Sequence, residues 1–149
     1  MEDTDLRNLE AIYDIRAFNR FFMNSLGIVD GNIPPGYPIS KGRILFEIRK
    51  AEPCTFSILC NNLKIDPGYI SRILRQITRE GLIKRHESSK DRRSAVLHLT
   101  DQGNNKLDEL INACNLMVHE LIKNLSDKDI KDLVFCAKRI EEILQKGEE

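Results

Sequence analysis

The sequence predicts a mainly α-helical, single-domain protein with one small β-hairpin. Apolar residues recur at every third or fourth position through most of the 149 residues, which is the period of an amphipathic helix. Two short runs of alternating apolar and polar residues flank a polar segment near residue 90, which is typical of a hairpin. A composition of 41% hydrophobic and 31% charged residues is that of an ordinary globular domain.

The first half of the chain predicts four helices. One is expected over residues 5–26, and the Gly- and Pro-rich segment after it cannot be helical. Ser40 is a suitable N-cap for a helix over 41–52, and Thr55 is one for a short helix that follows Pro53. A further helix is expected over 66–80. The apolar residues that should face the core are Ile44, Leu45, Ile48, Ile70, Ile73, Leu74 and Ile77.

The second half predicts the hairpin and two long helices. The hairpin strands are expected at 82–87 and 95–100, and Thr100 and Ser126 are suitable N-caps for helices that together span about 101–146. The apolar stripes of these helices are long for the core of one small domain. Together with the helix over 5–26 they favour a dimer interface, and an intramolecular bundle is the alternative.

The net charge of zero conceals an uneven distribution. Residues 40–93 hold thirteen basic and six acidic side chains, a net charge of +7, whereas the segments before and after carry −3 and −4. A basic middle between acidic ends suggests a local surface for a polyanion. A solvated charged face is the alternative.

The start of the helix over 66–80 indicates what that surface binds. Asp66 is a suitable N-cap, Pro67 suits the first helical position, and Gly68 allows a partner to approach the backbone. Two short helices, a tight connection, this helix and a charged hairpin form the pattern of a winged helix-turn-helix over about residues 40–100, whose third helix enters the DNA major groove. Its polar face carries Tyr69, Ser71, Arg72, Arg75, Gln76 and Arg79. Arg72 is the first candidate for a base contact, and Arg79 suits phosphate or solvent.

The hairpin tip carries a second set of candidates. The segment SSKDRRS places Lys90, Arg92 and Arg93 near a turn, and a positive tip of this kind suits the narrow minor groove. Asp91 is expected to hold one arginine in position through paired hydrogen bonds. A solvated hairpin turn is the alternative.

The segment DPGYISRILRQITREGLIKRHESSKDRRSAVLHLTDQG strongly resembles the core of the MarR (multiple antibiotic resistance regulator) family. The resemblance implies a homodimer that acts as a transcription regulator, usually a repressor, on a pseudo-palindromic operator in double-stranded DNA. The family's D-x-R wing motif maps onto Asp91 as the bracing carboxylate and Arg93 as the minor-groove residue, with Arg92 at the variable position. Its recognition-helix contacts map onto Gly68, Tyr69, Ser71, Arg72 and Arg75.

The resemblance also implies a small-molecule effector. Members of the family often bind small aromatic acids or phenols in a crevice between the dimerisation helices and the winged lobe. Arg16, Tyr37 and Arg43 are candidates to line such a crevice, with an arginine for a carboxylate, and each has a purely structural role as its alternative.

The cysteines give no sign of a metal site or a cofactor. Cys60, Cys114 and Cys136 fall in apolar-periodic segments, and none of the four forms a C-x-x-C pair. These three are expected to be buried, and Cys54, beside Pro53, is the least clearly buried and the candidate for redox sensing.

Other classes of protein fit less well. No apolar run approaches the roughly 20 residues of a membrane span, and the acidic start MEDTDLRNLE is unlike a secretion signal, so a cytoplasmic protein is expected. No arrangement of catalytic residues is apparent and the three histidines are scattered, so we do not expect an enzyme. A winged helix that binds another protein instead of DNA and a thiol-based redox regulator are the remaining alternatives.

Overall fold

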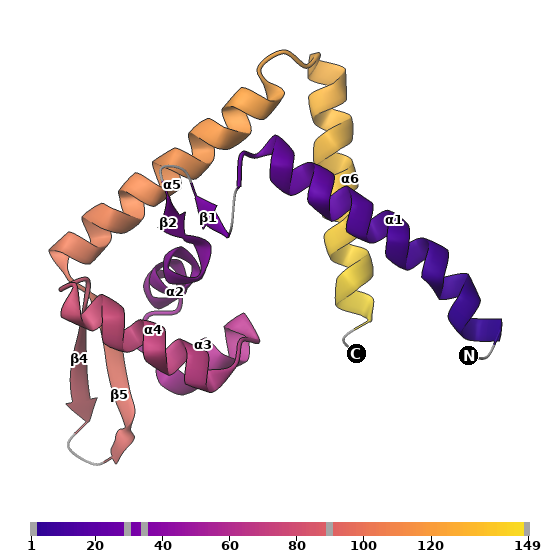
Figure 1. The fold of residues 1–149 in the computed structure, drawn as a ribbon. Helices are drawn as coiled ribbons and strands as arrows, with labels where there is room; N and C mark the ends of the chain where they lie inside the picture. Colours follow the sequence, from indigo (N-terminus) through magenta and orange to yellow (C-terminus); the bar gives the residue numbers. More distant parts are fainter. Residues whose placement is uncertain (1–2, 29–30, 34–35, 89–90, 148–149) are drawn as a thin grey trace.

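The computed structural model describes residues 3–28, 31–33, 36–88 and 91–147, without the side chains of 3–7, 88 and 91–94. It is a winged lobe from which long helices extend (Figure 1). The first of these helices, α1, spans Asp3–Ser25, which confirms the helix expected over 5–26. Gly27 follows it with φ +70, a left-handed conformation that glycine adopts without strain.

The segment expected to be non-helical contains a very short antiparallel sheet. Strand β1, Asn32–Ile33, pairs with β2, Tyr37–Pro38. Helix α2, Ile39–Lys50, begins directly after β2, so the N-cap residue is Pro38 and the expected cap at Ser40 is wrong. Ser40 lies inside the helix, where its hydroxyl oxygen accepts a hydrogen bond from the Tyr69 hydroxyl at 3.2 Å.

The helix-turn-helix follows the predicted order. Helix α3, Phe56–Leu63, is capped by Thr55, whose hydroxyl accepts a hydrogen bond from the Ile58 amide at 3.3 Å. Helix α4, Pro67–Arg79, is capped by Asp66. Gly81, with φ +76, follows α4 in the expected left-handed conformation.

The wing is a three-stranded sheet. Strand β4, Ile83–Ser88, and strand β5, Asp91–Leu99, form the expected hairpin, and β5 lies between β4 and the two-residue strand β3, Cys54–Thr55. The sequence did not predict β3, which exists only because Cys54 and Thr55 pair with Leu97 and Val96. This pairing fixes the start of α3 against the wing.

The core lies between α2, α3, α4, the sheet and the first half of helix α5. Ile44, Leu45 and Ile48 face it as predicted, each at most 1% exposed. Ile70, Ile73 and Ile77 are also buried, and Leu74 is half-buried at the edge. Burial of each such side chain contributes about 1.5–3 kcal/mol.

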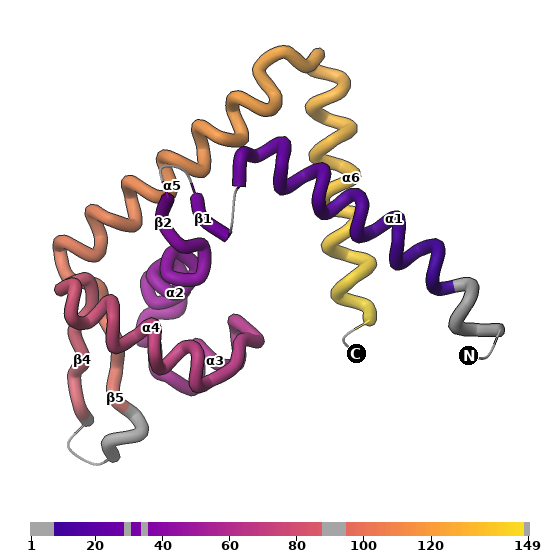
Figure 2. The backbone as a smooth tube through the Cα atoms, viewed as in Figure 1, coloured from indigo at the N-terminus to yellow at the C-terminus, as the bar shows by residue number. Residues whose placement is uncertain are grey.

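Two long helices complete the chain. Helix α5, Asp101–Ile122, is capped by Thr100, and α6, Asp127–Lys146, is capped by Ser126, both as predicted. The buried residues of α5 lie in its first half, and no described side chain of α1 or α6 is buried. Figure 2 shows α1 and α6 on the side of the molecule away from the β4–β5 hairpin. The apolar stripe of α6 is therefore largely uncovered within the described chain, which favours a dimer interface over the alternative of an intramolecular bundle.

None of the described helices is both long enough and apolar enough to span a membrane.

Candidate nucleic-acid interface

The first turn of α4 is built by three residues that are poor elsewhere in a helix. The Asp66 carboxylate accepts a hydrogen bond from the Tyr69 amide at 2.9 Å, and Pro67 takes the first position, where its missing N–H costs nothing. A Cβ added to Gly68 would lie 3.0 Å from the Asp66 carboxylate. A glycine at position 68 thus leaves room for the capping carboxylate of Asp66 and for the close approach of a partner.

The exposed face of α4 presents polar and cationic side chains to solvent. Tyr69, Arg72, Arg75 and Gln76 are exposed, and Ser71 is half-buried. The Arg72 guanidinium lies 5.5 Å from the centroid of the Tyr69 ring, a cation–π contact. Because the Tyr69 hydroxyl also donates to Ser40 on α2, the ring is held in place and restrains Arg72 in turn.

A groove between α4 and the wing sheet adds cationic residues to this face. It has a volume of about 740 Å³, and its lining includes Arg75 and Arg79 from α4 and Arg85 from β4. The Arg79 Nε donates to the Arg75 carbonyl oxygen at 3.4 Å. Sequence reasoning missed Arg85, although strand alternation places it on the same side as the buried Ile83, which faces α4.

The wing candidates fall largely outside the described part of the chain. Lys90 lies outside the described residues, as do the side chains of Asp91, Arg92 and Arg93, whose backbone belongs to β5. Ser88 pairs with Asp91, and both residues belong to the segment expected to form the tip. The proposed roles of these four residues stay predictions.

The effector candidates do not all meet. A cavity of about 520 Å³ lies between the segment that follows α1 and helices α2, α3 and α5, and Arg43 is among its lining residues, whereas Arg16 and Tyr37 are not. Arg16 is exposed on α1.

Tyr37 has a structural environment of its own. Its ring receives the Lys106 ammonium at 4.9 Å from the centroid, and its buried hydroxyl has no hydrogen-bond partner among the described residues. Burial, with a contribution from the negative charge of Glu80, raises the pKa of Tyr37 to about 12. The neutral phenol is therefore the form present at ordinary pH.

The structure reverses two expectations about the cysteines. Cys54 is fully buried because β3 pairs with β5 around it, and burial together with the Glu47 charge raises the pKa of its thiol to about 11. Such a thiol is a poor nucleophile. Cys136, expected to be buried, is exposed on α6, while Cys60 and Cys114 are half-buried. Among the residues that the structure describes, no three His, Cys, Asp or Glu side chains form a group that could hold a metal ion.

Residues 38–95 match the model of the MarR family. Among curated proteins, the chain is 31% identical over 81 residues to the HTH-type transcriptional regulator MgrA of Staphylococcus aureus, covering 54% of each chain. It is 24% identical over 90 residues to the HTH-type transcriptional regulator BilQ of Clostridioides difficile, covering 60% of this chain and 61% of BilQ. The matches thus span between half and two thirds of these relatives.

Solved structures share the fold over nearly the whole chain. A mutant of MarR from E. coli complexed with operator DNA has a TM-score of 0.68 at 21% identity, covering 93% of this chain and 99% of that one. Bordetella bronchiseptica BpsR, whose structure is described as explaining regulation of its DNA binding by 6-hydroxynicotinic acid, has a TM-score of 0.67 at 15% identity, covering 85% and 96%. The MarR family model thus matches the winged lobe, and these solved structures share the fold of the long helices as well.

Proposed function

We propose that the protein is a transcription regulator that binds double-stranded DNA as a homodimer. The observation that carries the proposal is the exposed cationic face of α4, with Arg72 held against Tyr69 and with Arg75, Arg79 and Arg85 around the adjoining groove. An arginine held in one orientation loses little conformational freedom when it binds a base edge, and bidentate contact with guanine is its commonest specific use. The DNA complex of the related MarR fold supports the same reading.

In this arrangement each residue set has its own task. The α4 face, comprising Gly68, Tyr69, Ser71, Arg72, Arg75 and Gln76, lies in the major groove. The wing tip, comprising Lys90, Asp91, Arg92 and Arg93, lies against the neighbouring minor groove. Two lobes must then sit about 34 Å apart to read one face of a duplex, which is why the dimer is part of the mechanism and why a pseudo-palindromic operator is expected.

Replacing Arg72 with alanine is expected to weaken operator binding by about 1–3 kcal/mol and to relax base preference at one position of each half-site. Arg72→Lys is the matched variant, because it keeps the charge and loses the two-pronged geometry. Gel-shift titrations against the operator and against single-base variants measure both effects. An equal loss of affinity on every sequence would indicate that Arg72 contacts a phosphate and not a base.

Replacing Arg93 with alanine is expected to weaken binding by about 1–3 kcal/mol, because an arginine in a narrow minor groove meets a strongly negative potential. Arg92→Ala removes the same charge from the next residue, at the variable position of the wing motif, and should cost less. The same gel-shift titration compares the two variants. Equal losses would indicate a general charge effect in place of an inserted Arg93.

We also propose that a small-molecule effector controls DNA binding, with repression relieved when it binds. The cavity of about 520 Å³ has the size of a typical ligand site and is lined mainly by apolar side chains, which suits an aromatic or phenolic molecule. The regulation of BpsR by 6-hydroxynicotinic acid supports control of DNA binding by a small molecule. An effector that favours the wrong separation of the two lobes would release DNA. Cytoplasmic location follows from the proposed DNA target.

A further inference from the structure

The cavity contains one buried charge in a mainly apolar lining. Of its residues, those with charged or amide side chains are Arg43, Glu47, Asn62 and Asn115. Glu47 is only 8% exposed and is the one charged residue classed as buried among the described side chains. A carboxylate is costly to remove from water unless hydrogen bonds or an opposite charge compensate it. The way in which Glu47 is compensated therefore decides what the cavity accepts.

The described structure compensates Glu47 only in part. Asn62 donates its side-chain amide to Glu47 Oε1 at 2.6 Å, and this is the one hydrogen bond to the carboxylate recorded among the described residues. A carboxylate has about four acceptor positions on its two oxygens. The charge also reaches the neighbouring buried thiol, where it contributes to the raised pKa of Cys54. The carboxylate thus has unused acceptor capacity in a mainly apolar site.

Arg43 does not cancel this charge. It lies one helical turn before Glu47 on α2, but its side chain is exposed, and no ion pair between the two is recorded. Exposed charges are screened by solvent and interact weakly, whereas charges in a dry site interact strongly. An anionic head group bound beside Glu47 would be repelled by its carboxylate.

We propose that the cavity binds a small apolar molecule with a cationic N–H head group, an amine or amidine, which donates to the Glu47 carboxylate. The inference rests on the proposed effector site and names the chemical class of its ligand. Such a head group supplies both the opposite charge and the missing donors, and charge-assisted hydrogen bonds are the stronger kind. The lining provided by Phe46, Leu107 and Ile111 receives the apolar body.

Helix α2 also connects this ligand to the DNA-binding face. In the first turn of α2, the Ser40 hydroxyl accepts a hydrogen bond from the Tyr69 hydroxyl, and Lys41 forms an ion pair with Glu80 at 2.6 Å. Helix α2 therefore contacts both ends of α4. Glu47 lies on the same helix. A ligand that moves α2 therefore moves the support of Tyr69 and, through it, of Arg72.

The test is isothermal titration of the full chain, without DNA, with two probes of the same shape. Naphthalene-2-carboxamidine is a cation and 2-naphthoate is an anion. The wild type is expected to bind the amidine at least tenfold more tightly than the acid. Glu47→Gln should lose at least tenfold in amidine affinity, whereas Glu120→Gln, which removes a surface carboxylate from α5, should lose none.

An acid that binds as well as the amidine would overturn the proposal, and so would an amidine that does not bind or that binds Glu47→Gln unchanged. The comparison of the two probes on the wild type stands even if Glu47→Gln fails to fold. A separate DNA titration keeps the two proposals apart. If the protein binds the amidine but no DNA, only the proposed regulatory function is refuted. If it binds DNA but not the amidine, only the proposed class of ligand is refuted.

Discussion

Replacing Gly103 with alanine is expected to lower the free energy of unfolding by about 3 kcal/mol or more, at or above the upper end of overpacking costs. A Cβ at this position would lie 1.9 Å from the Leu82 carbonyl oxygen and 2.9 Å from the carbonyl carbon. Both atoms are backbone, so no side chain can rotate away. The same oxygen accepts the Thr100 amide at 3.0 Å, so the displacement would also disturb the N-cap of α5.

Gly42→Ala is the matched control, because Gly42 is also a buried glycine inside a helix. A Cβ there would lie 3.6 Å and 3.7 Å from the ends of the Ile33 and Leu110 side chains, which is ordinary contact. The helix propensity of alanine should make this variant as stable as the wild type or more stable, by up to about 1 kcal/mol. Urea denaturation followed by circular dichroism measures both. A Gly103→Ala variant within 1 kcal/mol of the wild type would contradict the close packing of α5 on Leu82.

Replacing Ile140 and Leu144 together with lysine is expected to convert the proposed dimer to monomers and to weaken operator binding about 100-fold or more. The two residues lie on the apolar stripe of α6 and are 43% and 67% exposed in the single chain. Each buried Ile or Leu contributes about 1.5–3 kcal/mol, and a two-fold interface loses every contact twice. A monomer has only one DNA-binding lobe, so it loses the roughly 10²- to 10⁴-fold gain in affinity that bivalent binding provides.

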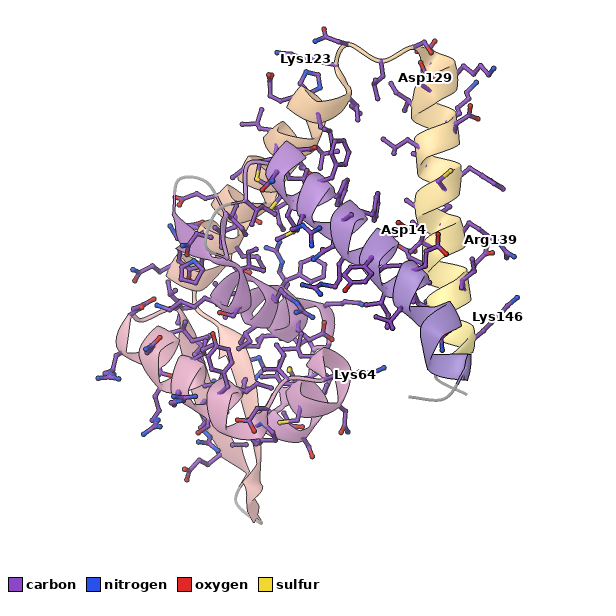
Figure 3. All side chains as sticks on the ribbon, turned by 45° about the vertical axis from the view of Figure 1, so that its right-hand side comes forward. Asp14, Lys64, Lys123, Asp129, Arg139 and Lys146 are labelled. Atoms are coloured by element: carbon purple, nitrogen blue, oxygen red, sulfur yellow. The ribbon has the colours of Figure 1, made fainter. Side chains whose placement is uncertain are left out.

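The matched control is Asp132→Asn with Glu142→Gln. It changes the net charge by the same amount on the polar side of α6, where the side chains of Arg139 and Lys146 are also carried (Figure 3). Glu142 pairs with Arg139 at 3.0 Å on the surface, an ion pair worth little. The control should remain dimeric by sedimentation equilibrium. If the lysine variant also remains dimeric, the stripe on α6 is not the dimer interface.

Local signals made most of the fold predictable. Thr55, Asp66, Thr100 and Ser126 each cap a helix by accepting from the amide three residues ahead, so the signal lies in a few adjacent residues. The misses depend on pairing between distant segments. Cys54 is buried because residue 97 lies beside it, and neither this pairing nor the sheet formed by β1 and β2 has a signature in its two-residue strands.

The candidate sites were partly predictable for the same reason. The polar face of α4 follows from helical spacing alone. Glu47 went unnoticed because an isolated glutamate in a charged helix is ordinary, although it adjoins the buried Ile48 and lies three residues after the buried Ile44. This spacing places Glu47 on the buried side of α2, and it was the signal from which its burial could have been predicted. Asn62 and the cavity itself required the packing of α3 and α5 against α2.

The most direct test of the central claim is a titration of the purified chain with the DNA upstream of its own gene, at several salt concentrations, combined with the mass of the complex. We expect two chains on each site and an association constant that falls steeply with salt, with a log–log slope of about −5 or steeper, as several phosphate contacts require. A chain that stays monomeric and shows no affinity for any duplex at about 50 mM salt would contradict the account.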